Sequence, residues 1–377
     1  MIAENVIDIR GVKYIKAQFS NSPRLKGWSI NVSLYTVLEK REIAQLAEDY
    51  GLGRVSKTEG IVNAPTHTSY RLDTAKGRYV LRIDEVKSEI DVRREIDLLL
   101  YLRKHGFPCP QLVVDRKGRP YHERDGRCLA LYKFVDGHAR EARHLTFAQI
   151  ENAGRVLADL HVVGKGYKKG VDNRFNFERV AEVYQEVRDR LPGYFKRITR
   201  TLDEEVAYLE HYLEGKLPKG IIHGDLFLDN IMFRGEKVVS IIEFEQASRG
   251  KYIFDLATAV NALCFDGERY DLKRFEALIG GYESLRTLSL AEWDAFPNEL
   301  RFSALRFTVN LLSEFFANPF DDSKRINKDF REFYDRLRIL RREREGGMEG
   351  LLMAMATGYD YRKYQKVRAI EKKGKSS

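Results

Sequence analysis

The segment from Ile221 to Phe233, IIHGDLFLDNIMF, places a carboxylate and an amide five positions apart on an expected loop between a helical region and a short strand. Asp225 could accept or orient the proton of an attacking hydroxyl group, and Asn230 could offer an amide oxygen to a hard cation. A third oxygen donor, Glu243, ends the next strand-like run, VVSIIE. This set suits phosphoryl transfer, which depends on positioning and charge neutralisation more than on covalent help. The alternative is a loop that is merely rich in turn-forming residues.

The N-terminal part of the chain, which must position a nucleotide for such chemistry, predicts a β-rich unit with an inserted helix. The run YTVLEKREIAQLAEDYGLG predicts a helix that opens on a capping box of Thr36 and Glu39 and stops at glycine. Three strand-like runs follow, SKTEGIV, TSYRLDT and RYVLRID, and then the amphipathic helix EIDVRREIDLLLYLRKHG. The strands QLVVD and CLALYKFV complete this unit, which we expect to end near Gly137.

The remainder of the chain predicts long amphipathic helices, apart from an island of short strands at 220–243. Together the two parts predict an α+β fold. The expected divisions are an N-terminal extension (1–30), a nucleotide-binding lobe (31–137), a lobe with the catalytic loop and the acceptor site (138–345) and a C-terminal extension with a basic tail (346–377).

Composition excludes several classes of protein. The longest apolar runs fall short of the ~20 residues that a membrane span needs, and early charged residues argue against a signal peptide. Three cysteines without metal spacing (Cys109, Cys128 and Cys264) indicate reduced thiols in a cytoplasmic protein. Of the net charge of +9, residues 1–30 carry +3 and residues 360–377 carry +5. Because the part between them is nearly neutral, nucleic-acid binding is disfavoured and the tail is expected to be a solvated end.

The run IIHGDLFLDNIMF, followed by FDLA, resembles the catalytic segment of the aminoglycoside-phosphotransferase/choline-kinase superfamily, which has a protein-kinase-like two-lobe fold. The resemblance implies Asp225 as catalytic base, Asn230 and Glu243 as metal ligands, and ATP and Mg²⁺ as cofactors. It also implies that Asp255 supports the loop and that His223 orients it. Glu243 departs from the family's usual aspartate, and its extra methylene predicts slower chemistry or a preference for Mn²⁺.

The N-terminal unit resembles the same superfamily less tightly. GRYVLRID is similar to its third strand, which implies that Arg82 contacts nucleotide phosphates and pairs with Glu95 of the next helix. LYKFVDG is similar to the linker between lobes, which implies that the backbone of Phe134 and Val135 binds adenine. The segment EGIVNAPTHTSY departs from the family pattern, and hydroxyl groups that could face phosphate there belong to Thr66, Thr68 and Ser69. The alternatives are that Arg82 is a surface cation, that Glu95 is an exposed charge on its helix, and that the hydroxyl groups belong to an ordinary turn.

Within the superfamily, the chain most resembles the bacterial type II homoserine kinases over roughly residues 31–345, in its opening helix and in the order of GY, R-x-L-S and ALRF. Homoserine is a zwitterion with a primary hydroxyl, so its site needs a cation for the carboxylate and oxygen acceptors for the ammonium. Candidates on the C-terminal helices are Asn261, Arg306, Asn310 and Glu314. We therefore expect a kinase of a small-molecule hydroxyl, homoserine or a related amino alcohol, with a homodimer as one possible assembly.

Other functions remain open on sequence alone. An aminoglycoside or choline kinase, or a protein kinase of the same superfamily, would share the catalytic segment. A catalytically silent nucleotide-binding module acting through partners would bind nucleotide without transferring phosphate to any acceptor. A nucleic-acid-binding protein would lose affinity steeply as salt rises.

Overall fold

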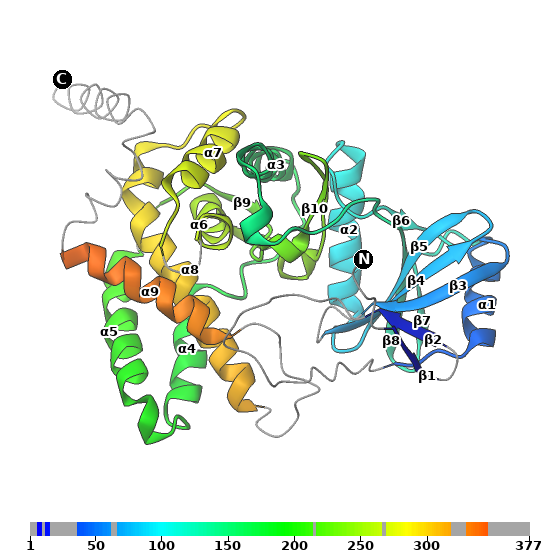
Figure 1. Cartoon of the computed structure of the whole chain (residues 1–377), viewed down its shortest axis with the longest axis horizontal. Helices are drawn as coiled ribbons and strands as arrows, with labels where there is room; N and C mark the ends of the chain where they lie inside the picture. The colour runs from blue at the N-terminus through cyan, green and yellow to red at the C-terminus, as the bar shows by residue number, and fades with distance from the viewer. Residues whose placement is uncertain are drawn as a thin grey trace. The chain divides into compact units, whose positions relative to one another are not determined.

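The computed structural model describes most of the chain between Thr36 and Glu345, together with two short N-terminal strands (Figure 1). The described residues are 6–9, 12–15, 36–61, 66–213, 216–265, 269–317 and 329–345. Most of both expected extensions, and residues 62–65 of the segment EGIVNAPTHTSY, lie outside them. Contacts divide the chain after Asp136 into an N-terminal unit and a C-terminal unit that starts at Gly137.

One mixed sheet forms the frame of the N-terminal unit, with strand order β1-β2-β3-β4-β5-β8-β6 and β7 paired with β8. The strands are β1 (Val6–Ile9), β2 (Val12–Ile15), β3 (Val55–Ile61), β4 (His67–Thr74), β5 (Gly77–Asp84), β6 (Leu112–Val113), β7 (Tyr121–Arg124) and β8 (Arg127–Lys133). All pairs are antiparallel except β2–β3, which is parallel. The expected β-rich unit is thus present, with a β1–β2 hairpin that the sequence did not predict.

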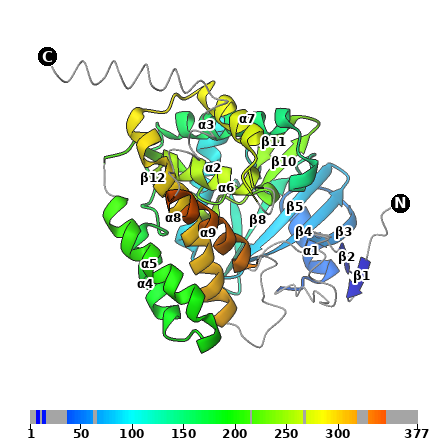
Figure 2. The same ribbon diagram turned by 60° about the vertical axis from the view of Figure 1, so that its left-hand side comes forward.

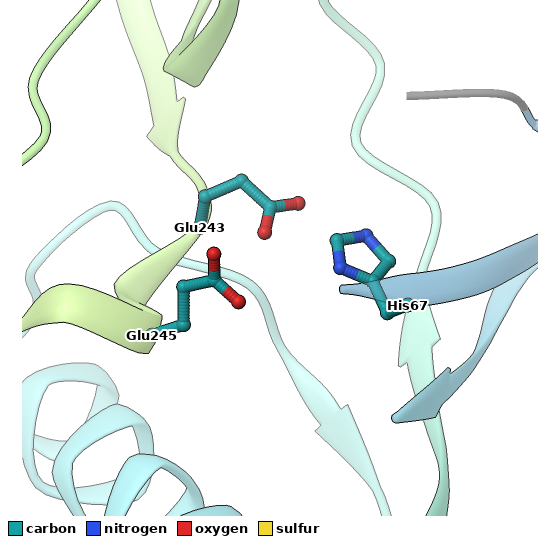
Figure 3. A group of neighbouring side chains, drawn as sticks. All are labelled: His67, Glu243 and Glu245. Atoms are coloured by element: carbon teal, nitrogen blue, oxygen red, sulfur yellow. The ribbon is translucent and has the colours of Figure 1, made fainter. Parts of the chain in front are cut away.

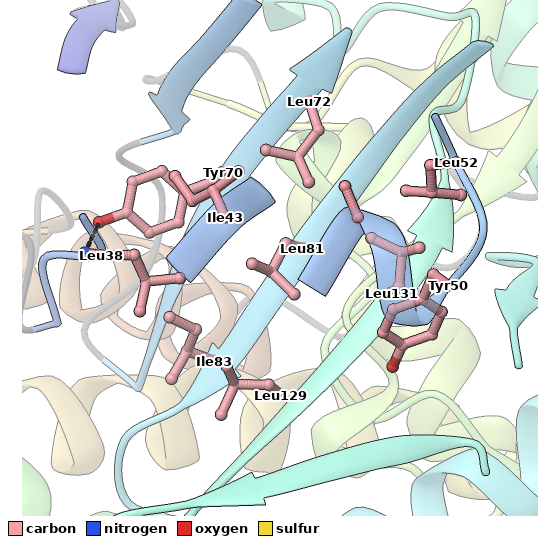
Figure 4. Close-up of a cluster of buried hydrophobic side chains, with 11 residues drawn as sticks. Leu38, Ile43, Tyr50, Leu52, Tyr70, Leu72, Leu81, Ile83, Leu129 and Leu131 are labelled. Carbon is pink, nitrogen blue, oxygen red and sulfur yellow. Dashed lines mark hydrogen bonds between the residues drawn. The ribbon is translucent and has the colours of Figure 1, made fainter. Parts of the chain in front are cut away.

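The two faces of this sheet follow from the alternation of side chains along each strand. One face packs on helix α1 (Lys40–Asp49) and forms a buried core (Figure 4). Its sheet residues are Tyr70 and Leu72 of β4, Leu81 and Ile83 of β5, and Leu129 and Leu131 of β8. The phenol of Tyr70 accepts from the Leu38 amide at 3.2 Å and donates to the Thr36 carbonyl at 2.7 Å, so it ties the segment before α1 to the sheet.

Helix α1 begins three residues later than the sequence predicted. The Glu42 carboxylate accepts from the Glu39 amide at 2.7 Å, so the capping box starts at Glu39. Thr36 lies outside the helix, and its amide donates to the hydroxyl of Thr68 at 3.3 Å. Glutamate occurs at the third helical position from both starts, Glu39 after Thr36 and Glu42 after Glu39, and Thr36 is engaged with strand β4 instead.

Helix α2 (Glu89–Lys104) follows the predicted pattern. Ser88 caps its first turn by accepting from the Asp91 amide, and Gly106 follows the helix in the left-handed conformation (φ +82°) that glycine adopts readily. The predicted apolar stripe is buried, and it consists of Val92, Ile96, Leu99 and Leu102.

The C-terminal unit is mostly helical, as expected (Figures 1 and 2). Its helices are α3 (Phe147–Gly164), α4 (Phe177–Arg188), α5 (Lys196–Tyr212), α6 (Tyr252–Leu263), α7 (Leu272–Glu283), α8 (Leu290–Ala317) and α9 (Phe330–Glu345). Two strand pairs form the predicted island, β9 (Lys219–Ile222) with β12 (Ser248–Lys251) and β10 (Ile231–Arg234) with β11 (Lys237–Ile241). The α+β expectation is confirmed. No helix among the described residues is long and apolar enough to cross a membrane.

Close helix packing sets the frame around the island of strands. Helices α3 and α7 approach each other closely at Gly154 and Gly281. Glycine is needed at both positions, because a Cβ there would lie about 2 Å from a carbonyl oxygen of the facing helix. Helix α8 packs on both α6 and α9. It starts well before the predicted run FSALRF, with Ser289 and Glu292 in a capping box and Pro297 inside the helix.

Candidate active site

The expected catalytic loop joins β9 to β10, and its last residues form the short 3₁₀ turn η3 (Leu228–Asn230). Asp225 is half-buried and Asn230 is buried. The Asn230 Nδ2 donates to the Asp225 carbonyl at 2.8 Å and contacts its carboxylate oxygen Oδ2 at 3.3 Å. The loop therefore brings the two residues together. With the amide nitrogen used in this way, the amide oxygen of Asn230 is the atom left to meet a cation.

Asp255 of α6 holds the backbone of the loop by hydrogen bonds. This fully buried carboxylate accepts from the amides of His223 and Gly224, each at 2.7 Å, and from Nε2 of His161 at 3.0 Å. Burial raises the pKa of Asp255, but the hydrogen bonds from His161 and from the Gly224 amide oppose it, and the pKa lies below its usual value. An ionised Asp255 thus fixes the two residues before Asp225, as expected of a loop support.

Behind Asp255 lies a buried chain of polar side chains that the sequence did not reveal. The ring of His161, on α3, also bonds the phenol of Tyr282 at 2.6 Å, and that phenol accepts from Arg286 at 3.0 Å. Arg286 in turn donates to Glu292, at the start of α8. Burial lowers the pKa of His161, so we assign a neutral ring that donates from Nε2 to Asp255 and accepts at Nδ1 from Tyr282.

His223 lies within the loop, and in the described chain its ring hydrogen-bonds to backbone atoms. Its Nε2 donates to the Ile242 carbonyl at 2.9 Å, and its Nδ1 accepts from the Asp225 amide at 3.2 Å. Burial lowers its pKa, so the ring is neutral near pH 7. Both nitrogens are engaged, and this arrangement supports the orienting role over proton transfer.

Glu243 follows β11 in a left-handed backbone conformation, with φ 63° and ψ 60° (Figure 3). Among described residues other than glycine, only Asp125 shares a positive φ. Such strain typically costs about 1–3 kcal/mol and concentrates at functional sites. The turn η4 (Phe244–Gln246) comes next and carries Glu245, also labelled in Figure 3. The amide of Ile242 donates to the Asn230 carbonyl at 2.9 Å, so the strand end that bears Glu243 is anchored to the catalytic loop.

The four proposed substrate residues fall into two groups. Asn261 is fully buried, and its amide donates to the Leu300 carbonyl and accepts from the phenol of Tyr270. Arg306 is also buried and bonds to Gly224 and Gln246. These contacts leave neither side chain directed at an open acceptor site. Two further helix positions, Asn310 (half-buried) and Glu314 (exposed), are accessible.

In the N-terminal unit, the expected pair of Arg82 and Glu95 is present on the sheet face that packs against α2. Arg82 donates to Glu95 at 3.0 Å and to Asp84 at 3.1 Å. Lys87, which the sequence did not single out, lies 2.5 Å from Glu95 and 3.3 Å from Asp84. Burial raises the pKa of Glu95, but the two cations outweigh it and lower the pKa to about 2. The result is a fixed group of two cations and two carboxylates.

Replacing Glu95 with Gln should destabilise the protein in a pH-dependent way. The pKa of about 2, against an ordinary 4.5, corresponds to about 3 kcal/mol of stability that is present above pH 4.5 and lost as the pH falls towards 2. The difference in unfolding free energy between wild type and Glu95→Gln should therefore shrink as the pH is lowered from 6 to 3. Urea unfolding at each pH measures it. A difference that stays constant would contradict the ion-pair account.

The candidate hydroxyls lie on different faces of the sheet. Ser69 pairs in register with Arg82 and shares its face. Thr68 alternates with it and lies towards α1, where its hydroxyl donates to Glu85 at 2.7 Å. Thr66 precedes β4 and bonds the ring of His67, the strand's first residue (labelled in Figure 3). Ser69 is therefore the hydroxyl best placed beside Arg82.

The proposed adenine-binding segment follows β8. The Phe134 amide donates to the Arg78 carbonyl at 3.0 Å, and the guanidinium groups of Arg71 and Arg78 lie over the Phe134 ring. Because this amide is used within the sheet, adenine would have to bind the carbonyl of Phe134 or the backbone of Val135.

Comparison with known proteins identifies the family to which this constellation belongs. The family model described as the phosphotransferase enzyme family matches residues 64–288. The chain belongs to this family. A homoserine kinase of Caulobacter sp. (strain K31) is 32% identical over 291 residues, which cover 76% of this chain and 90% of that protein. The chain is thus a phosphotransferase that acts on an alcohol group of a small molecule, and the family's chemistry uses ATP and a divalent metal.

Comparison with solved structures shows that this chain has a kinase-like fold. A microcompartment-associated aminopropanol kinase is 22% identical, with a TM-score of 0.61, over 81% of this chain and 97% of that chain. Choline kinase from Cryptosporidium parvum Iowa II is 14% identical, with a TM-score of 0.62, over 84% of this chain and 99% of that chain. These likenesses confirm the expected fold. The homodimer and the cytoplasmic location stay predictions.

Proposed function

We propose that this phosphotransferase is a homoserine kinase that uses ATP and Mg²⁺. The observation that carries the proposal is the joined pair of segments bearing Asp225, Asn230 and Glu243, in a chain that matches homoserine kinases over most of its length. Asp225 directly follows the two residues whose amides Asp255 holds, and we assign it as the base. The metal assignment fits the donor atoms, which are an amide oxygen and a carboxylate.

In this proposal Asp225 accepts the proton of the homoserine hydroxyl as the oxygen attacks. Asp255 holds the amides of the two residues before Asp225, and the His223 ring accepts from the amide of Asp225 itself. Asn230 and Glu243 would hold the metal, which would neutralise phosphate charge when ATP is bound. In the N-terminal unit, Arg82 contributes a cation for the phosphates, and Glu95 and Lys87 keep its guanidinium in place.

Recognition of homoserine needs groups for both its charges. The accessible candidates Asn310 and Glu314 can serve the ammonium, by amide oxygen and carboxylate respectively. Because an aminopropanol kinase shares the fold, amino alcohols without a carboxylate form the natural comparison series.

A coupled assay of ADP release against L-homoserine, L-serine, L-threonine, aminopropanol, ethanolamine, choline and an aminoglycoside tests the proposal. We expect homoserine to give the highest kcat/KM, and phosphorus NMR should identify a phosphomonoester product. Turnover with another acceptor and none with homoserine would overturn the substrate assignment. Nucleotide binding with no turnover on any acceptor would favour a silent module.

A further inference from the structure

Helix α8 inserts one guanidinium between the two segments that carry the proposed base and metal ligand. Nη1 of Arg306 donates to the carbonyl of Gly224 at 2.6 Å, and Nη2 donates to Oε1 of Gln246. Gly224 directly precedes Asp225, and Gln246 follows Glu243 by three positions. The same side chain thus contacts both segments.

Arg306 is an expensive residue to bury. Its side chain is 1% exposed, and it forms no ion pair with a carboxylate among the described residues. Rings of Phe175, Phe254 and Phe307 surround the guanidinium, with centroids 4.3, 5.6 and 4.6 Å from its central carbon. A buried cation without a bonded carboxylate is destabilising, because its desolvation is not offset by an ion pair. Retaining it makes sense where its hydrogen bonds perform a task that a neutral side chain cannot.

The charge of Arg306 persists at neutral pH. Burial lowers its pKa to about 10, and the negative charges of Asp225 and Asp255 oppose that effect. The remaining donor, Nε, is buried and has no hydrogen-bond partner in the described chain, so it does not reach an acceptor site. A substrate carboxylate would have to displace either Gly224 or Gln246 to bind this guanidinium.

Two hydrogen bonds already join the two segments, one from the His223 ring to the Ile242 carbonyl and one from the Ile242 amide to the Asn230 carbonyl. At Gly224 the approach is close, since a Cβ there would lie 3.2 Å from the Gln246 carbonyl oxygen, and φ is +76°. Arg306 supplies a side-chain link across the same approach. We propose that Arg306 and Gln246 form a positioning pair that sets the spacing between Asp225 and Glu243, and that Arg306 is not the receptor for the substrate carboxylate.

This inference rests on the roles assigned above to Asp225 and Glu243, and Gln246→Leu tests it. Gln246 is half-buried, so the variant should fold. We expect the activation constant for Mg²⁺ to rise by about tenfold, the range seen when a residue supporting a metal ligand is removed. The KM for homoserine should stay within about twofold, because uniform substrate binding is untouched. Gln246→Glu keeps an acceptor oxygen for Arg306 and should retain the wild-type metal constant.

Arg306→Lys should change the metal constant in the same direction as Gln246→Leu. The matched control is Arg301→Lys, on the same helix. Arg301 is equally buried but donates to Glu205 of α5 at 2.7 Å, so its loss should lower stability and leave the metal constant unchanged. A large rise in the KM for homoserine in Arg306→Lys, with a normal metal constant in Gln246→Leu, would overturn the positioning pair in favour of substrate binding.

A readout without acceptor separates this inference from the proposed function. Mn²⁺ binding to the protein with ATP, followed by electron paramagnetic resonance, should weaken in Gln246→Leu and Arg306→Lys but not in Arg301→Lys. This holds whichever alcohol the wild-type enzyme phosphorylates. Unchanged Mn²⁺ affinity in both variants would refute the pair, even if homoserine proves to be the substrate.

Discussion

Asp225→Asn is expected to lower kcat by about 10²–10⁴-fold, the usual contribution of a positioned general base. The amide keeps the shape and can still bond Asn230, so the loop should remain folded. Binding of ATP with metal, measured by isothermal titration calorimetry, should change little. Loss of kcat without loss of nucleotide affinity is the signature of a group that acts on the transition state.

Asp229→Asn provides a matched control for that experiment. Asp229 lies on the same loop, four residues further on, and its side chain is exposed. Asp229→Asn removes one negative charge, as Asp225→Asn does, so any general electrostatic effect on the loop should appear in both variants. Equal losses in the two would show that Asp225 has no special role as a base.

Glu243→Gln should produce the second large effect, a loss of metal affinity greater than the ~10–100-fold that removal of a merely supporting residue causes. The amide has nearly the same size as the carboxylate but lacks the negative charge that attracts a divalent cation. Glu243→Asp, in contrast, restores the carboxylate at a position one methylene closer to the backbone. Because Mg²⁺ demands a tighter, near-octahedral geometry, this variant should raise Mg²⁺-supported activity relative to Mn²⁺-supported activity.

Steady-state rates with each metal, at saturating ATP, measure the ratio of Mg²⁺-supported to Mn²⁺-supported activity. The left-handed backbone at Glu243 also favours Asp over Glu, since short polar side chains tolerate positive φ better. If Glu243→Asp leaves both the rate and the metal ratio unchanged, the extra methylene has no functional consequence. If Glu243→Gln keeps wild-type metal affinity, the assignment of Glu243 as a ligand is wrong.

Local patterns were enough to predict the elements that carry the site. Alternating apolar residues predicted β4 and β5, and the stripe from Val92 to Leu102 predicted α2, because each signal is complete within one element. The pairing of Arg82 with Glu95 followed from a family resemblance, and the structure contains it. The predicted start of α1 was wrong because Thr36, the expected cap, bonds to Thr68 and Tyr70 of the distant strand β4.

The supports of the site could not be predicted, because their partners are far apart in sequence. His161 meets Asp255 across 94 residues and Tyr282 across 121. Arg306 looked like a substrate residue because its four-residue spacing with Asn310 suggested a shared helix face, whereas burial decides which way it faces. The strained backbone at Glu243 has no sequence signal, since glutamate is not a residue that favours positive φ.

The β1–β2 hairpin has a consequence for how truncated proteins would behave. Strand β2 pairs in parallel with the last three residues of β3, Glu59 to Ile61, so it covers backbone amides and carbonyls that would otherwise have no partner strand. Removing the first thirty residues, as the resemblance to shorter relatives invites, would leave these three residues of β3 without a partner strand on that side. Exposed edges of that kind recruit strands from other molecules. We therefore expect the truncated enzyme to associate with itself more readily than the full chain, quite apart from any effect on phosphoryl transfer.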